Sequence, residues 1–446
     1  MAAPDIEKLT PDELREAWPA LSDEERQQGF ALLTTDEAEE FVSHLSAREA
    51  FTLISALPDS ARRRFLRLLP PDDIADLVQE APEEQREAIL DLLDGSVRTE
   101  VRALLAYAED EAGGLMNPRF ARLRPDMTVE EAISYLRRLK SHTAELIYYG
   151  YVVDADQRLL GVVSFRELVT APPQQKLRDL MTTDLVTVPE DMDQEEVSHI
   201  FARADLYCLP VVDAAGRIKG IVTADDIVDV VKEEATEDMH KIGGSEALDA
   251  PYLDVGLLHL VRKRALWLAA LFIGESMTAT AIAFFEEEIA KAVVLALFIP
   301  LIISSGGNAG SQASTLVIRA MALGEVRLRD WWRVIRRELA SGVALGSFLG
   351  LIGLSRVLLW EQVHRAASGT ALYGEHYILV GLTVAFAVLG CVTWGTLAGS
   401  MLPFILRSLK LDPASASAPF VATLVDVTGV IIYFSVASLI LRGTLL

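Results

Sequence analysis

Residues 419–434 read PFVATLVDVTGVIIYF, and one carboxylate, Asp426, lies near the middle of this otherwise apolar run. The segment around it, Ala414–Leu441, is long enough to cross the hydrocarbon core of a bilayer as a helix. A charge at mid-membrane costs about 2.5–3.5 kcal/mol even on insertion scales, so it marks a functional site by default. Because the natural partner of a lone carboxylate in a pore is a cation, we expect Asp426 to bind one.

Four further apolar segments have the length of membrane spans. The five predicted spans are Ala265–Phe285, Ala292–Ile318, Leu339–Trp360, Tyr377–Leu406 and Ala414–Leu441. With the N-terminus inside, eleven Lys and Arg residues flank the spans on the inner side and four on the outer side, as the positive-inside rule requires. We therefore expect a cytoplasmic N-terminus and, because five is odd, a C-terminus on the other side.

The second predicted span contains SSGGNAGSQAST, residues 304–315. Paired glycines, Gly306 and Gly307, let helices approach closely or turn backbone carbonyls toward a cavity. Asn308 and Gln312 are four residues apart, so they share one helix face and can bind ion-bound water. Ordinary packing of small residues is the alternative, but it does not call for Asn and Gln at this depth. These four residues join Asp426 and the nearby Gly429 as the predicted pore set.

Other acidic residues of this half have weaker claims. Glu275 is central in the first span and could line a path, be protonated or bond a neighbouring helix; we favour the interpretations outside the pore. The triplet Glu286–Glu288 could attract cations at a pore mouth, but we interpret it as a solvated turn.

The first part of the chain is strongly acidic. Residues 1–258 hold 53 Asp and Glu against 26 Lys and Arg, a net charge of −27, and residues 259–446 hold 11 against 15, a net of +4. The acidic excess argues against nucleic-acid binding, and it suits either a surface that gathers divalent cations or plain solubility. Two cysteines, Cys208 and Cys391, are too few for a disulfide framework or a zinc cluster. The first residues lack the features of a signal peptide.

The first ninety residues repeat every twelve positions. The repeat is marked by an apolar residue followed by Ser, Thr or Pro, at Leu9, Leu21, Leu33, Leu45, Leu57, Leu69 and Ala81. Ser and Thr caps and first-turn Pro begin helices, so seven short helices in an all-α superhelix are predicted over residues 1–112.

A second repeat covers residues 113–231 with an offset of 59, since GVVSFREL at Gly161 matches GIVTADDI at Gly220. The copies, 113–177 and 178–231, each read strand, helix, two strands, helix. This α/β pattern resembles a tandem CBS domain, whose clefts often bind ATP or another adenine nucleotide. The resemblance places a ribose contact at Thr223 and Asp226.

A connecting segment, residues 232–260, follows and continues an acidic run. Its acids and those just before it recur at helical spacing, at Asp226, Asp229, Glu233, Glu234, Glu237 and Asp238. Like charges four residues apart oppose helix formation, and a divalent ion would reverse that penalty. A solvated acidic helix is the alternative; we favour an ion-sensing connector because the segment leads to the spans.

These features together resemble the MgtE family of magnesium channels, in domain order and in the groupings at 306–312 and 424–429. The resemblance implies a multidomain membrane protein: a helical superhelix, a CBS pair, a connecting or plug helix and a five-helix membrane domain over 261–446. It implies a homodimer in the cell (inner) membrane that imports Mg²⁺ and closes when cytosolic Mg²⁺ binds its carboxylates. The corresponding positions are Asp72, Asp76, Asp226, Asp229, Glu234, Glu237 and Asp238.

Two alternatives stay open. The first is a broader divalent channel that also passes Mn²⁺, Co²⁺ or Ni²⁺, although oxygen ligands around Asp426 favour hard ions. The second is a nucleotide-regulated transporter of another substrate; an anion path would need basic residues at mid-depth. The sequence contains no enzyme signature, since neither a phosphate-binding loop nor a nucleophile–base set is present.

Overall fold

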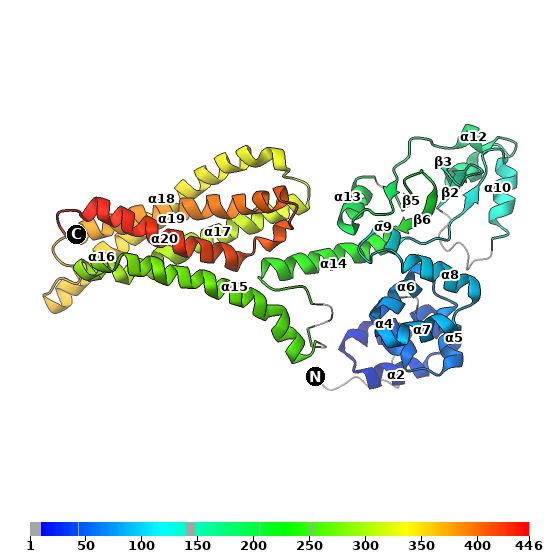
Figure 1. Cartoon of the computed structure of the whole chain (residues 1–446), viewed down its shortest axis with the longest axis horizontal. Coiled ribbons are helices and arrows are strands. Elements are labelled where there is room, and N and C mark those ends of the chain that lie inside the picture. The colour runs from blue at the N-terminus through cyan, green and yellow to red at the C-terminus, as the bar shows by residue number, and fades with distance from the viewer. Residues whose placement is uncertain are drawn as a thin grey trace. The chain divides into compact units, whose positions relative to one another are not determined.

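The computed structural model describes residues 10–445 apart from 43, 140–147, 205, 249, 251 and 254. The chain divides into two compact units, Met1–Lys232 and Glu233–Leu446 (Figure 1). Leu9, the first residue of the predicted twelve-residue repeat, lies outside the described residues.

The first unit begins with short helices whose starts are spaced by twelve residues. They are α1 (Pro11–Ala17), α2 (Asp23–Leu32), α3 (Thr35–Val42), α4 (Ala47–Ser55), α5 (Asp59–Leu66), α6 (Pro71–Glu80), α7 (Glu83–Leu92) and α8 (Gly95–Leu104). Capping boxes begin several of them, as where Ser46 and Glu49 bond each other at the start of α4. The seven predicted helices are confirmed, and α8 continues the period as an eighth.

The CBS pair forms two small sheets of the same topology. The first copy contains β1 (Arg122–Leu123), α10 (Val129–Leu136), β2 (Tyr149–Val153), β3 (Leu159–Ser164) and α11 (Phe165–Thr170). The second contains β4 (Val188–Pro189), α13 (Gln194–Ala204), β5 (Cys208–Val212), β6 (Ile218–Thr223) and α14 (Ala224–Ile242). Short helices α9 (Ala112–Leu115) and α12 (Leu177–Leu180) lie at the starts of the two copies. In each sheet the middle strand pairs in parallel with the first strand and antiparallel with the third, so the predicted repeat is confirmed.

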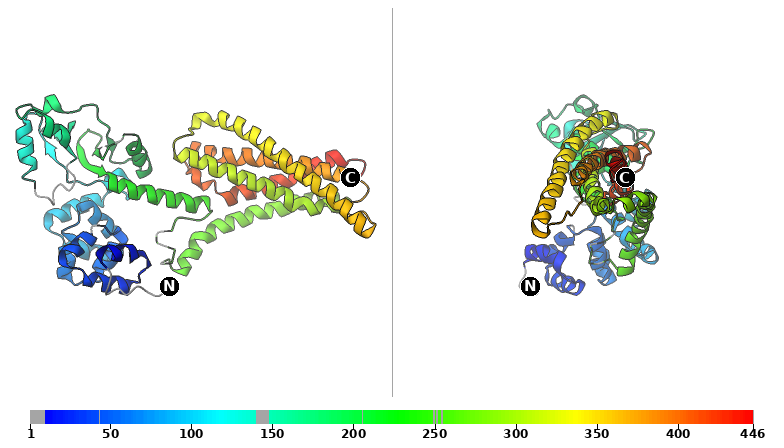
Figure 2. Two further views of the ribbon diagram at one scale, coloured as in Figure 1. Left: turned by 180° about the vertical axis from the view of Figure 1, so that it is seen from behind. Right: turned by 90° about the vertical axis from the view of Figure 1, so that its left-hand side faces the viewer.

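The second unit contains five helices long and apolar enough to cross a membrane. They are α15 (Leu257–Phe284), α17 (Ile299–Ala322), α18 (Trp331–Ser368), α19 (Tyr377–Ser408) and α20 (Ala418–Leu441). Figure 2 shows them running along a common direction. Helix α16 (Glu286–Lys291) contains the acidic triplet and follows α15 directly.

Glycines set how closely the central helices of this unit approach. A Cβ on Gly395 of α19 would lie 2.3 Å from the carbonyl oxygen of Gly306 in α17, and one on Gly399 would lie 2.1 Å from that of Gly310. The two helices therefore touch backbone to backbone, as small residues allow in membrane bundles. Helix α15 differs, because only 6% of its most apolar stretch is buried.

Candidate functional site

The Asp426 carboxylate on α20 faces the glycine pair of α17. A Cβ on Gly307 would lie 3.7 Å from Asp426 Oδ1 and 3.4 Å from the Cα of Ala422. Because glycine has no side chain there, the carboxylate lies against the open backbone of α17. The structure thus brings together Asp426 and Gly307, two members of the predicted pore set.

Gly306 and Gly429 serve helix packing. A Cβ on Gly306 would lie 3.0 Å from the carbonyl oxygen of Cys391, and one on Gly429 would lie 3.3 Å from the side chain of Ile303. The Cys391 thiol also donates to the carbonyl oxygen of Gly429 at 3.5 Å. These two glycines let α17, α19 and α20 approach, which positions Asp426 and Gly307.

Asn308 and Gln312 lie on an exposed face of α17, together with Ser304. The three residues follow one another at intervals of four, so they form one polar stripe at membrane depth. Among the described residues, neither Asn308 nor Gln312 forms a hydrogen bond with Asp426. The stripe is oriented outward from a single copy of the chain.

Glu275, for which we favoured interpretations outside the pore, lies near the candidate site. Its side chain on α15 lies close enough to Asp426 for the charges of the two carboxylates to act on each other. Helices α15 and α20 can approach closely here because residue 274 is a glycine. A Cβ on Gly274 would lie 2.8 Å from the Thr423 methyl group. The available signal was depth, since Glu275 and Asp426 both lie near the middle of their spans.

Three side chains hold the start and the middle of α20 against its neighbours. Ser311 donates to the carbonyl oxygen of Ala418 at 2.9 Å, and Ser314 donates to that of Ala416 at 2.8 Å. The indole Nε1 of Trp394 donates to Thr428 Oγ1 at 2.8 Å, two residues beyond Asp426. The carboxylate is therefore fixed by contacts on both sides along its helix.

In the first unit the structure brings Asp72 of α6 beside Asp226 of α14. Asp72 is only 6% exposed, and its Oδ1 is buried with no hydrogen-bond partner among the described residues. Asp226 Oδ2 accepts from the Thr223 amide at 3.0 Å and from its hydroxyl at 2.5 Å. Burial, reinforced by the neighbouring carboxylate of Asp226, raises the pKa of Asp72 well above its usual value. Burial likewise raises the pKa of Asp226 to about 6, against the lowering effect of Thr223.

These two carboxylates line a cavity of about 140 Å³, with Asp73 and Asp225 at its wall. Asp76 adds its negative charge near Asp72, and Asp229 does so near Asp226. An unpartnered buried carboxylate oxygen among like charges is a chemically sound place for a divalent cation. Even so, no three His, Cys, Asp or Glu side chains within the described chain converge as a complete ligand set.

The remaining predicted regulatory carboxylates, Glu234, Glu237 and Asp238, lie on the part of α14 that belongs to the second unit. The Lys241 ammonium forms two ion pairs, one with Glu237 at 2.5 Å and one with Asp412 at 2.6 Å. Lys241 and Asp412 were not predicted from the sequence, since neither stands out by depth or periodicity. The next residue, Ile242, packs against Ala414 and Ala416 in the loop before α20.

The predicted nucleotide pair, Thr223 and Asp226, forms the cap that begins α14. Ser164 and Glu167 of the first copy form the same arrangement at the start of α11. This second pair lines a separate cavity of about 200 Å³ with Tyr149 and Thr182.

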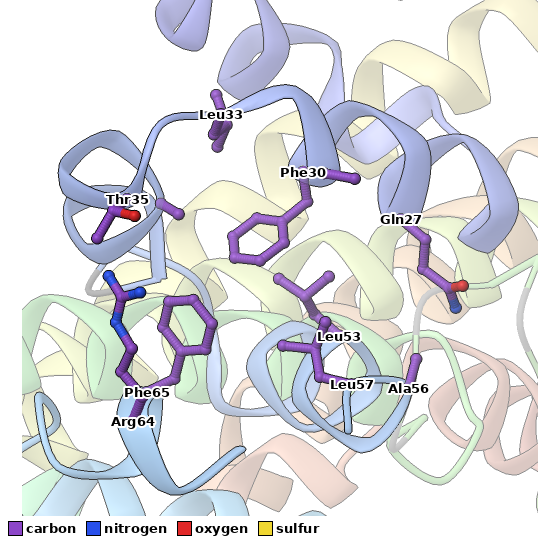
Figure 3. Close-up of a pocket in the computed structure, with 11 residues that line it drawn as sticks. Gln27, Phe30, Leu33, Thr35, Leu53, Ala56, Leu57, Arg64 and Phe65 are labelled. Atoms are coloured by element: carbon purple, nitrogen blue, oxygen red, sulfur yellow. The ribbon is translucent and has the colours of Figure 1, made fainter. Parts of the chain in front are cut away.

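A further cavity of about 380 Å³ lies among the N-terminal helices. Figure 3 shows Phe30, Leu53 and Phe65 around it, and the rings of Phe30 and Phe65 are 5.5 Å apart. Arg64 at its edge pairs with Glu39. No carboxylate lines this cavity and the cationic Arg64 does, so it is a poor place for a divalent cation.

Comparison with known proteins agrees with this division of the chain. Residues 299–436 match the MgtE family, described as divalent cation transporters, residues 9–110 match the MgtE intracellular N domain, and residues 112–173 and 177–233 match CBS domains. The magnesium transporter MgtE of Thermus thermophilus is 40% identical over 98% of this chain and 94% of its own length. That of Bacillus subtilis is 30% identical over 97% and 92%.

A solved structure titled as the cytosolic domain of the Mg²⁺ channel MgtE in complex with ATP is 43% identical, with a TM-score of 0.47. It covers 50% of this chain and 92% of its own. On the extent of the full-length matches, this chain belongs to the MgtE family of magnesium transporters.

Proposed function

We propose that Mg²⁺ crosses the membrane past Asp426 and Glu275 as a hydrated ion. Mg²⁺ releases its six waters reluctantly, so carboxylates that bind through those waters permit passage without full dehydration. The observation that carries this proposal is the Asp426 carboxylate, which lies against Gly307 and near the Glu275 carboxylate at mid-span. Asn308 supplies an amide for the same water shell.

We further propose a homodimer with one pore on its two-fold axis. The polar stripe of Ser304, Asn308 and Gln312 is exposed in the single chain at membrane depth. Polar side chains within a membrane face a protein interior or a water-filled path, so the stripe calls for a second copy. The eleven-to-four distribution of basic residues supports a cytoplasmic N-terminus in the cell (inner) membrane.

Closure by cytosolic Mg²⁺ is proposed to act through α14. A cation between Asp72 and Asp226 would relieve repulsion at the start of this helix, and the acids Glu234 and Asp238 lie further along it. Its other end is joined to the loop before α20 by Lys241. Ion binding therefore favours one arrangement of a helix that continues to the pore domain, which is the linkage that negative feedback needs.

For the adenine nucleotide we propose the cavity at Tyr149, Ser164 and Glu167. The cavity at Thr223 is smaller, and four carboxylates line it, which would repel a polyphosphate. This assignment replaces our expectation of a ribose contact at Thr223 and Asp226.

The test is Mg²⁺ entry into proteoliposomes with a trapped indicator, across a range of Mg²⁺ on the cytosolic face. We expect flux in the unmodified protein that falls as cytosolic Mg²⁺ rises, and no flux in Asp426→Asn. The matched control is Glu375→Gln, which removes an exposed acid that does not belong to the predicted pore set. Equal flux in Asp426→Asn and the control would refute the pore assignment. Competition by Mn²⁺, Co²⁺ and Ni²⁺ in the same assay decides between a Mg²⁺ channel and a broader one.

A further inference from the structure

The N-terminal end of α18 and the turn before it carry a dense basic and aromatic patch. Within residues 327–337 there are five arginines and one aspartate, a net charge of +4. The patch is formed by Arg327, Arg329, Trp331, Trp332, Arg333, Arg336 and Arg337, all of them exposed. Among the described residues, Asp330 provides the only ion pair to these arginines, to Arg333 at 3.1 Å.

The outward face of this helix end is fixed by what lies on its inner face. Val334 packs against Val317, Met321 and Phe404. At about 100° per residue, Trp332 and Arg336 each lie about 200° from Val334, on the opposite side of the helix. They are therefore directed away from the bundle.

The same outward face continues into the membrane span. Leu339 and Val343 follow at about 140° and 180° from Val334 and are each 45% exposed. The outward face is therefore aliphatic at Leu339 and Val343, and it becomes aromatic and basic toward the start of α18. The 38 residues of α18 span about 57 Å, well beyond a hydrocarbon core of about 30 Å, so its two ends extend to the membrane surfaces.

We propose that Trp332, Arg333 and Arg336 bind the headgroup of an anionic phospholipid whose acyl chains lie along Leu339 and Val343. Guanidinium groups bind phosphate through paired hydrogen bonds, and tryptophan prefers the level of the headgroups. An acidic peptide or a free phosphate would use the arginines but would leave the adjoining aliphatic stripe unexplained. The proposal uses the proposed orientation of the chain, because anionic lipids are concentrated at the cytoplasmic surface.

The test uses the full chain in lipid nanodiscs of phosphatidylcholine that contain either brominated phosphatidylglycerol or brominated phosphatidylcholine. Bromine quenches nearby tryptophan, and subtracting the signal of a Trp332→Phe protein isolates Trp332. We expect stronger quenching by the brominated anionic lipid. Replacing Arg333 and Arg336 by Gln should reduce that preference by about fivefold per arginine, while replacement by Lys should retain part of it.

The matched control removes two charges elsewhere on the same membrane side, by Arg262→Gln and Arg264→Gln. It should leave the preference at Trp332 unchanged, and added inorganic phosphate should not compete. Equal quenching by both lipids in the unmodified protein would overturn the proposal. Equal loss in the control would also overturn it, since the preference would then come from general surface charge. Mg²⁺ flux is not the readout, so failure here leaves the ion path untouched.

Discussion

The ammonium of Lys241 bridges two carboxylates, 2.6 Å from Asp412 and 2.5 Å from Glu237. Burial alone would lower the pKa of Lys241, but its bonds to Asp412 and Glu237 outweigh that effect and raise the pKa. The lysine thus stays charged throughout the physiological range and joins α14 to the loop that precedes α20.

We expect Lys241→Gln to weaken inhibition by cytosolic Mg²⁺, because α14 would lose its ionic link to the pore domain. The Mg²⁺ concentration that halves the flux should rise about fivefold. This factor corresponds to the ~1 kcal/mol that a partly exposed ion pair contributes. Exchanging the charges in Lys241→Asp with Asp412→Lys should restore much of the response. As a control, Lys410→Gln removes one positive charge from the loop that contains Asp412. An equal shift in this variant would argue against the link.

Replacing Glu275 by Gln tests its role beside Asp426. The amide has nearly the same shape as the carboxylate but carries no charge, so the packing of α15 is kept while the attraction for the ion is lost. We expect flux to fall by at least about tenfold, since a close charge contact is worth more than 1.4 kcal/mol. Unchanged flux, with unchanged selectivity for Mg²⁺ over Na⁺, would return Glu275 to a packing role.

Local signals predicted most of the fold. Long and mostly apolar runs indicated the spans, and Ser, Thr and Pro at helix starts indicated the N-terminal helices. Helix α8 escaped because Leu93 is followed by Asp94 and Gly95, outside that pattern. The site was harder to predict than the fold. Asp426 stands out in the sequence as a charge in an apolar run. The neighbours of Glu275 and Lys241 depend on how separate helices pack, and no local sequence pattern encodes that packing.

The carboxylates at Asp72 and Asp226 should make local stability depend on pH when Mg²⁺ is absent. Their pKa values are raised in the folded chain, so the folded state binds more protons than the unfolded state. The stability contribution is therefore fully present below about pH 4 and is lost as the pH rises through about 6. Amide exchange in α6 and at the start of α14 should be at least about tenfold faster at pH 8 than at pH 5, after correction for intrinsic rates.

Two further measurements complete that test. Asp72→Asn should remove most of the pH dependence, and millimolar Mg²⁺ should restore protection at pH 8 by binding the folded state. Exchange that is insensitive to both pH and Mg²⁺ would count against a cation between the two carboxylates.

Thr182→Phe should abolish ATP binding measured by calorimetry, because Thr182 lines the larger CBS cavity but not the one at Thr223, and the added ring would fill that larger cavity. Asp73→Asn alters the other cavity and should leave the affinity unchanged. The reverse pattern would place the nucleotide beside Thr223.

Gly395→Ala should destabilise the membrane unit, because its Cβ would lie 2.3 Å from the Gly306 carbonyl oxygen. Overpacking of this kind costs about 1–3 kcal/mol, which thermal unfolding in detergent would detect. Gly256→Ala is the control, since nothing lies within 4 Å of its Cβ position. Equal stability of the two variants would contradict the close contact of α17 with α19.

The hydrogen bond from Trp394 to Thr428 has a practical consequence. Indole emission shifts when its N–H loses or gains a partner, and this indole is bonded two residues from Asp426. With the other five tryptophans replaced by phenylalanine, the protein would contain a built-in optical probe of its pore helix. Ion entry and closure could then be followed in real time without an attached dye.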